Sequence, residues 1–165
     1  MLLKSFVQTS LSAQGKPPAW DVSLVLKSLA TALYEPLAEV LNKYLAQKIL
    51  FLLALASAKR IGELHAIAYR ISHTRGWESI ACSFVPGFVA NTQDPSVSDP
   101  RFEGFSVPAL PREGAEPGGR LLCPVRAVRL YLDRTSVSRP GCCKLFISTG
   151  INKKEVTRNT LSFWL

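Results

Sequence analysis

An unbroken apolar run over residues 49–56 constrains this chain more than any other feature of its sequence. Basic residues flank the run on both sides. A membrane-spanning helix needs about 20 apolar residues, so this run is too short to cross a bilayer. A helix that is apolar nearly all round must instead be buried inside the protein. We therefore expect a central core helix that begins near Leu41 or Lys43 and ends at Ser57.

Composition and charge are those of one basic domain. The chain has 165 residues, 47% of them hydrophobic and 19% charged, which is enough for a single domain with a real core. Lys and Arg number 20 against 12 Asp and Glu, which gives a net charge of +8 and a pI near 9.6. Residues 121–165 hold eight basic and two acidic residues, and so most of the excess. This balance indicates an acidic partner such as nucleic acid and says nothing about the fold.

The cysteines, the histidines and the first residues of the chain indicate in which cellular compartment the protein is found. No pair of cysteines has metal-ligand spacing, and the two histidines, His65 and His73, belong to no metal-binding pattern. We expect no metal site and four free thiols in a reducing compartment. Residues 1–6 hold no apolar run long enough for a secretory signal. The expectation is a nuclear or cytosolic protein that is neither secreted nor in a membrane, with thiols at Cys82, Cys123, Cys142 and Cys143.

Apolar residues at helical spacing predict four further helices. Their limits come from capping and breaking residues. We expect one helix from an N-cap at Asp21 to Glu35-Pro36, one over residues 60–67, one from Pro124 to Asp133, and one that begins at an N-cap at Thr157. On the third of these, the solvated face is expected to carry Arg126, Arg129 and Arg134.

Alternation of apolar with other residues predicts short strands. A further short strand is expected over residues 144–148, and loops are expected over residues 91–104 and 111–119, which are rich in polar residues, Pro and Gly. The predicted fold class is therefore α+β, mostly helical with a small antiparallel sheet. The alternating apolar residues are Ile80, Cys82 and Phe84 in one strand and Phe105, Val107 and Ala109 in the next.

The basic pair that follows the core helix is the most informative candidate site. Lys59 and Arg60 open a second helix, and Arg60 and Glu63 share one face because they are three residues apart. The start of a helix attracts a phosphate, and an arginine there can hold two phosphate oxygens with its planar guanidinium. The alternative is an exposed Arg–Glu ion pair, worth under about 1 kcal/mol. Signatures of the common enzyme classes do not occur in the sequence.

Residues 52–67 (LLALASAKRIGELHAI) resemble the first signature box of the tyrosine recombinases, also called phage-type integrases. That box is an apolar helix, small residues, an arginine, an apolar residue, a small residue, an acidic residue and a leucine. Arg60 and Glu63 match its arginine and its acidic residue. Residues 18–26, 122–127 and 156–164 are similar, in the same order and spacing, to recombinases of eukaryotic mobile elements, especially retrotransposons. The resemblance covers residues 17–165.

The resemblance implies DNA strand cleavage and rejoining, in recombination and integration, without a metal or nucleotide cofactor. In the family a tyrosine attacks the scissile phosphate, and arginines with a histidine stabilise the charged transition state. A lysine on a strand hairpin protonates the leaving oxygen. Arg60 is then the implied catalytic residue, and Glu63 would orient the box. Double-stranded DNA is the implied partner, and a homo-oligomer on DNA is left open.

Several catalytic groups of the family have no match in this sequence. Residues 72–110, where the hairpin lysine should lie, contain no lysine, and Asn91 stands where we expect it. The histidine-x-x-arginine pair and the nucleophile would follow the helix that begins at Thr157. We therefore expect residues 17–165 to be the N-terminal part of a catalytic domain, and residues 1–16 to be a remnant or linker of an upstream helical domain. All four tyrosines precede the position of the nucleophile: Tyr34, Tyr44, Tyr69 and Tyr131.

The basic C-terminal segment offers further DNA contacts. Its basic and amide side chains stand just before or at the start of the last helix, where phosphate contacts form readily. Members of the resembled family also contact the DNA backbone there, although a solvated loop is the alternative. The predicted DNA-binding residues are Lys59, Arg60, Lys153, Lys154, Arg158 and Asn159.

The sequence thus predicts an incomplete tyrosine-recombinase core that binds DNA and does not cleave it alone, because the nucleophile and the hairpin lysine are missing. Two other interpretations stay open. One is a non-catalytic DNA-binding remnant, whose affinity should fall steeply with salt. The other is an interaction module or unstable gene fragment without a DNA role, for which an exposed apolar face would be the sign.

Overall fold

The computed structural model describes residues 21–89, 104–111, 119–139, 141–150 and 152–165. The remnant expected at residues 1–16 lies outside these ranges, as do Asn91 and most of the two expected loops.

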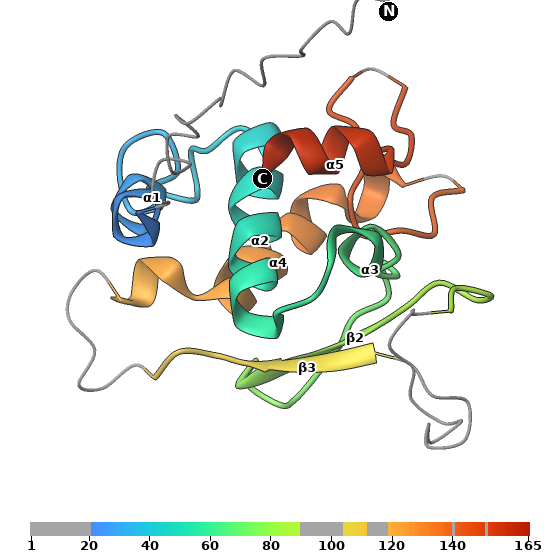
Figure 1. Ribbon diagram of the computed structural model, residues 1–165, viewed down its shortest axis with the longest axis horizontal. Helices are drawn as coiled ribbons and strands as arrows, with labels where there is room; N and C mark the ends of the chain where they lie inside the picture. The colour runs from blue at the N-terminus through green and yellow to red at the C-terminus, as the bar shows by residue number, and fades with distance from the viewer. Residues whose placement is uncertain (1–20, 90–103, 112–118, 140, 151) are drawn as a thin grey trace, which may run out of the picture.

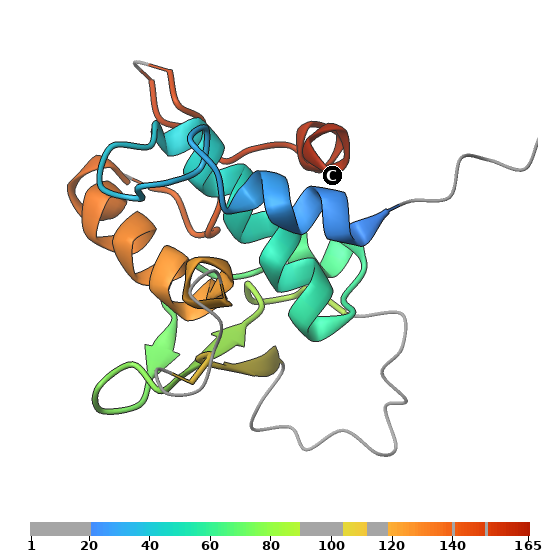
Figure 2. The same cartoon turned by 90° about the vertical axis from the view of Figure 1, so that its left-hand side faces the viewer.

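Helices lie on one side of the molecule and a small sheet lies on the other (Figure 1, Figure 2). Three strands pair antiparallel in the order β1-β2-β3. The fold class is therefore α+β and mostly helical with a small antiparallel sheet, as predicted. The helices are α1 (Val22–Leu29), α2 (Asn42–Ser57), α3 (Ile61–His65), α4 (Pro124–Thr135) and α5 (Arg158–Trp164); the strands are β1 (Ser72–His73), β2 (Ser79–Ser83) and β3 (Gly104–Pro108); short 3-10 segments span Gly119–Leu122 and Ser136–Ser138.

Helix α2 forms the centre of the core, as the apolar run predicts. Leu45, Ile49, Leu50 and Leu53 are all 0% exposed, and the helix packs against α4 and β3. The burial of each such side chain contributes roughly 2 kcal/mol to the stability of the fold, because its apolar surface is removed from water. The helix ends because Ala58 adopts the left-handed conformation at φ 52 and donates its N–H to the last turn. The predicted limits of the core helix are confirmed.

The sheet covers this core with the alternate residues of its strands. Ile80 pairs with Val107 and Cys82 pairs with Phe105 across β2 and β3. Ile80, Cys82 and Val107 are buried, whereas the intervening residues of β2 are half-exposed. The alternation that predicted the two strands is confirmed, because only one face of the sheet meets the helices.

Capping residues begin the helices where the sequence predicts. The Asp21 carboxylate accepts the N–H of Ser23 at 2.9 Å, and the Thr157 hydroxyl accepts the N–H of Thr160 at 3.2 Å. Pro124 occupies the first position of α4, where its missing N–H costs no helical hydrogen bond. These local signals were sufficient to place three helix starts.

Helix α1 is shorter than predicted. It ends at Leu29 rather than at Glu35-Pro36, and Leu33, which lies within the predicted helix, is 56% exposed. The reason is a long-range contact, because the Leu29 carbonyl accepts a hydrogen bond from the Lys48 ammonium at 2.7 Å. That carbonyl oxygen no longer needs a partner one turn further along a helix. Helix α3 is also shorter than the predicted residues 60–67 and ends at His65.

The strand expected over residues 144–148 does not form. This segment makes only the isolated bridges Ala68↔Lys144 and Ile147↔Glu155. The guanidinium of Arg139 accounts for the difference, since it donates to the carbonyl oxygens of Lys144 and Leu145 at 2.9 and 2.8 Å. A side chain thus takes two acceptors that a neighbouring strand would have used.

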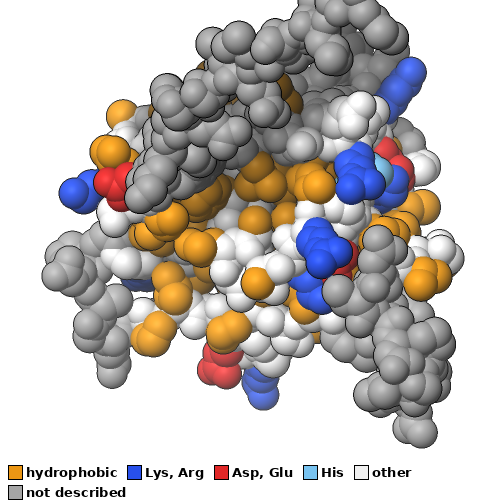
Figure 3. All heavy atoms as spheres, in the orientation of Figure 1, with side chains coloured by type: hydrophobic (Ala, Val, Ile, Leu, Met, Phe, Trp, Pro, Cys, Tyr) orange, Lys and Arg blue, Asp and Glu red, His pale blue; other side chains and the backbone are white. Residues whose placement is uncertain are grey.

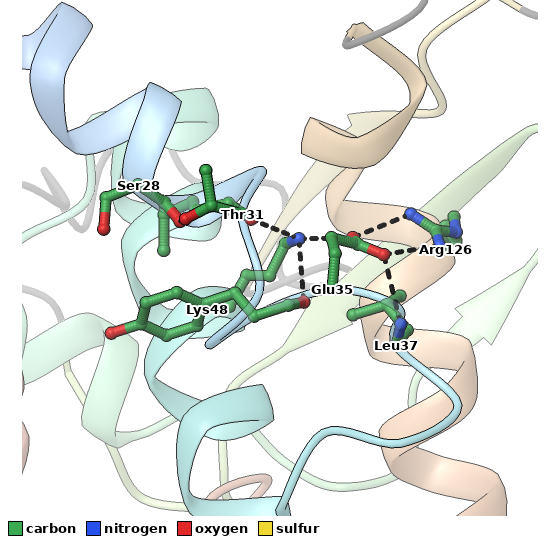
Figure 4. A network of polar contacts seen from close by, with 8 residues as sticks. Ser28, Thr31, Glu35, Leu37, Lys48 and Arg126 are labelled. Carbon is green, nitrogen blue, oxygen red and sulfur yellow. Dashed lines mark hydrogen bonds and ion pairs between the residues drawn. The ribbon is translucent and has the colours of Figure 1, made fainter.

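Two of the three arginines expected on the solvated face of α4 are instead tied into the protein. Arg126 donates two hydrogen bonds of 3.0 Å to the Glu35 carboxylate, which also pairs with Lys48 (Figure 4). Arg134 donates to the carbonyl oxygens of Leu37 and Val40 at 2.8 and 2.6 Å. The prediction was wrong for both, because the loop between α1 and α2 returns across α4 and presents acceptors there. Arg129 is exposed as expected.

Candidate nucleic-acid interface

The segment that resembles the recombinase box, residues 52–67, spans the last part of α2, the turn after it and α3. The Glu63 carboxylate accepts the backbone N–H of Arg60 at 3.0 Å and pairs with the Lys59 ammonium at 3.1 Å. Burial alone would raise the pKa of Glu63, but these hydrogen bonds and charges outweigh it and hold the pKa below its ordinary value. Glu63 therefore stays ionised and fixes the turn through backbone and lysine.

Arg60 itself is exposed at the N-cap of α3. The ion pair of Glu63 is made with Lys59, so the alternative of a simple Arg60–Glu63 side-chain pair is not what this turn contains. Because α3 has only five residues, its dipole is too short to attract a phosphate strongly. Any anion binding here must come from the basic side chains.

Arg158 joins this turn from the far end of the sequence. Gly62 lies directly beneath it, since a Cβ atom added to Gly62 would be 3.6 Å from the Cζ atom of the Arg158 guanidinium. Two features of α5 bring Arg158 there: the Thr157 cap fixes where the helix starts, and Leu161 is fully buried in the core. The structure therefore brings Lys59, Arg60 and Arg158 to one face, which we call the α3–α5 face.

On the surface, Lys and Arg side chains gather over α3 and the start of α5, beside a histidine (Figure 3). Arg60 and Arg158 are exposed, and Lys59 is half-buried. Asn159, also exposed, is the next residue of α5. Exposed guanidiniums can each donate two parallel hydrogen bonds to a phosphate.

Sequence reasoning missed a small polar cluster that supports this face. The His65 ring places Nε2 3.0 Å from the Val156 carbonyl oxygen and 3.4 Å from the Lys144 ammonium. Lys144 also pairs with Glu155 at 3.4 Å, and the Glu155 carboxylate accepts the N–H of Cys143 at 2.8 Å. No local spacing signals this cluster, because its members come from two distant segments.

Burial and the neighbouring Lys144 lower the pKa of His65, and the carbonyl of Val156 offsets part of that change. The imidazole is therefore neutral at pH 7. It joins α3 to the segment before α5 by a hydrogen bond when Nε2 carries the proton.

The other predicted DNA-binding residues do not gather on the same face. Lys153 lines an open groove of about 650 Å³ with Lys43 and Arg134, at the start of α2. Its ammonium donates to the Thr149 carbonyl oxygen at 3.4 Å. Lys154 is exposed in the same loop, where its backbone pairs with Ser148. The predicted set therefore divides between two surfaces.

The described residues contain no metal-ligating cluster, and several of their potentially nucleophilic side chains are buried. They hold no group of three or more His, Cys, Asp or Glu side chains that could bind a metal ion. Tyr131 is 1% exposed, its hydroxyl accepts the N–H of Ile147, and burial raises its pKa. All four cysteines are free thiols, and three are buried; burial raises the pKa of Cys82 to about 12.

Across the described segments, no helix has the length and apolar character that crossing a membrane requires. Comparison of the chain with models of protein families, with curated proteins and with solved structures finds no match. The chain's own residues and their arrangement therefore carry any statement about its function.

Proposed function

We propose that this chain binds double-stranded DNA through the α3–α5 face, as the N-terminal part of a tyrosine-recombinase-like core that acts in DNA recombination and integration. One observation carries the proposal: the Arg158 guanidinium packs over Gly62, which is two residues along the chain from Arg60. The resemblance assigns both residues to DNA on the basis of separate sequence segments. The packing of Arg158 over Gly62, which lies in the same segment as Arg60, is an independent reason to group them.

The chemistry of this face suits a phosphodiester backbone. Arg60 and Arg158 are exposed, and a guanidinium loses little hydration when it binds a phosphate. Glu63, the nearest carboxylate of the turn, is 7% exposed and occupied by Lys59 and a backbone N–H. Its negative charge is thus turned inward. The net charge of +8 adds a long-range attraction to DNA.

Duplex-DNA binding measured by fluorescence anisotropy tests the proposal. We expect affinity to fall steeply between about 50 and 200 mM salt, by about one unit of log–log slope for each phosphate contact. Arg60→Gln and Arg158→Gln should each weaken binding about tenfold and reduce that slope by about one, because each removes charged hydrogen bonds to phosphate.

Arg70→Gln is the matched control, since Arg70 is an exposed arginine that contacts the Tyr69 ring and is not one of the residues that define the α3–α5 face. It should leave affinity within about twofold. Equal losses of DNA affinity in all three variants would mean that only the net charge of the protein matters, and not the α3–α5 face. Binding that is absent, or that does not respond to salt, would refute the proposal.

The same proposal predicts binding without strand cleavage by the 165-residue chain. Residues 72–110 contain no lysine to serve as general acid. The buried Tyr131 hydroxyl is held by Ile147 and cannot reach a bound phosphate. After incubation with nicked duplexes, we expect no covalent protein–DNA adduct on a denaturing gel. An adduct that survives denaturation and disappears in a Tyr→Phe variant would contradict this prediction.

A further inference from the structure

A second basic site lies between the sheet and α4, on elements that the α3–α5 face does not use. A pocket of about 210 Å³ is enclosed by the β1–β2 turn, the end of β3, the 3-10 segment Gly119–Leu122 and the start of α4. Nine of the residues that the structure describes line the pocket; none of these nine is acidic, and three are arginines: Arg120, Arg126 and Arg129.

Two of these arginines are held in place by the protein. The Arg129 guanidinium lies 5.5 Å from the centre of the Trp77 ring. Trp77 is itself stacked on His73, with ring centres 3.9 Å apart and an angle of 11° between planes. Arg126 is fixed by its two 3.0 Å hydrogen bonds to Glu35. Guanidiniums fixed before binding lose less conformational entropy when a ligand arrives.

Charge and size define the ligand. Arg126 and Lys48 share the Glu35 carboxylate, which occupies the Arg126 guanidinium. Arg120 and Arg129 therefore provide the guanidiniums for a ligand, and two positive charges suit a dianion. Guanidiniums match the geometry of phosphate oxygens. The pocket is smaller than the roughly 300 Å³ at which drug-sized sites begin, so the ligand must be compact. Trp77 and the 40% exposed Leu110 provide an apolar wall for an organic group.

We propose that this pocket binds a small phosphomonoester, with its dianionic phosphate between Arg120 and Arg129 and a short apolar group against Trp77 and Leu110. Nothing in the DNA-binding proposal requires this site, because the two surfaces are built from different elements. Each can therefore fail without the other.

Isothermal titration calorimetry with phenyl phosphate tests the proposal. Phenyl sulfate is the matched ligand control, because it has the same shape with one negative charge instead of two. We expect phenyl phosphate to bind at least about tenfold more tightly than phenyl sulfate, because a second charge-assisted hydrogen bond is worth over 1.4 kcal/mol. Equal affinities, or no binding of phenyl phosphate at millimolar concentration, would overturn the proposal.

Variants locate the binding. Arg120→Gln and Arg129→Gln should each reduce the affinity for phenyl phosphate about tenfold. Arg75 is an exposed arginine in the β1–β2 turn that does not line the pocket. Arg75→Gln should therefore leave the affinity for phenyl phosphate within about twofold of the wild-type value. Circular dichroism identifies any variant that has lost its fold, and exposed Arg120 provides a variant that removes no core contact. An equal loss in Arg75→Gln would overturn the proposal.

Duplex-DNA binding separates the two sites. Arg120→Gln and Arg129→Gln should keep their DNA affinity within about twofold, whereas Arg60→Gln and Arg158→Gln should keep their affinity for phenyl phosphate. If the pocket variants lose DNA affinity as strongly as Arg60→Gln, the pocket belongs to the DNA surface and the proposal of a separate small-molecule site is wrong.

Discussion

At the scale of single residues, Lys48 is the most unusual feature of this protein. Its side chain is 0% exposed, yet its ammonium donates to the Leu29 carbonyl oxygen and pairs with Glu35. Burial lowers the pKa of Lys48. Burial alone would raise the pKa of Glu35, but the hydrogen bonds from Arg126 and Lys48 hold it below its ordinary value. The three groups together end α1 and join the loop after it to α2 and α4.

Removing the carboxylate from this network should be costly. Glu35→Gln leaves the Lys48 ammonium buried without a counter-charge, and we expect a loss of about 3 kcal/mol in the free energy of unfolding. Chemical denaturation checks the value. Lys48→Met alone and the double variant complete a thermodynamic cycle, in which the double variant should cost less than the sum of the two single changes. Strict additivity would contradict the coupling.

The same carboxylate predicts a pH dependence. A group whose pKa is lowered by folding contributes stability that is present above its unfolded pKa and is lost as pH falls through the folded pKa. The stability gap between wild type and Glu35→Gln should therefore narrow as pH falls below the ordinary value of 4.5. Glu63 and Glu155 also have lowered pKa values, but the wild type and Glu35→Gln both retain these two residues. Their contributions to the pH dependence therefore cancel in the difference. A gap independent of pH would contradict the assignment.

At the scale of elements, α5 depends on a cap more than on its own length. It has seven residues, too few to be stable as an isolated helix. The Thr157 hydroxyl satisfies one of its first N–H groups, and Leu161 anchors it in the core. Arg158 lies between these two residues, so the cap also determines where its guanidinium stands relative to Gly62.

Thr157→Ala should cost about 1 kcal/mol of stability, because an N-cap hydrogen bond is lost. DNA affinity should fall with it, since the position of Arg158 is loosened. Thr157→Asp retains a capping oxygen and serves as the control, with stability close to that of the wild type. Thermal denaturation and anisotropy measure the two effects. If the alanine variant matches wild type in both, the cap does not position Arg158.

At the scale of the whole molecule, charged and apolar surfaces lie side by side. Hydrophobic side chains gather over α2, between α1 and α5, next to the basic α3–α5 face (Figure 3). These helices carry apolar residues with large exposed fractions: Leu24 at 64%, Leu55 at 52% and Phe163 at 90%. The apolar run of α2 is therefore not buried all round. An apolar surface of this kind is typical of a contact site or of a tendency to aggregate.

We expect the isolated chain to self-associate as its concentration rises. Phe163→Ser should shift that association to higher concentration, because it removes the most exposed aromatic ring on these helices. Light scattering over a concentration series measures the effect, and Val137→Ser is the matched control, since Val137 is 95% exposed on a different segment. If both substitutions change self-association equally, or if no self-association occurs, the apolar surface over α2 does not mediate it.

The sequence by itself determined the local structure of this protein. Spacing of apolar residues predicted α2, β2 and β3, and capping residues predicted the starts of α1, α4 and α5. These signals succeed because helix and strand periodicity, and the hydrogen bonds of a cap, involve residues only a few positions apart. Arg60 and Arg158 could likewise be named as candidate DNA-binding residues, each from its own segment of the sequence.

Only the tertiary structure decided which of these residues meet. The packing of α5 on α3 puts Arg158 over Gly62, whereas the same basic segment sends Lys153 to another groove. A long-range contact with Lys48 also ended α1 at Leu29, and the Arg139 side chain took the backbone acceptors of Lys144 and Leu145 in the segment expected to be a strand. The physical reason is the same in each case. A charged side chain binds whichever acceptor the folded backbone brings within reach, and spacing along the chain does not encode that distance.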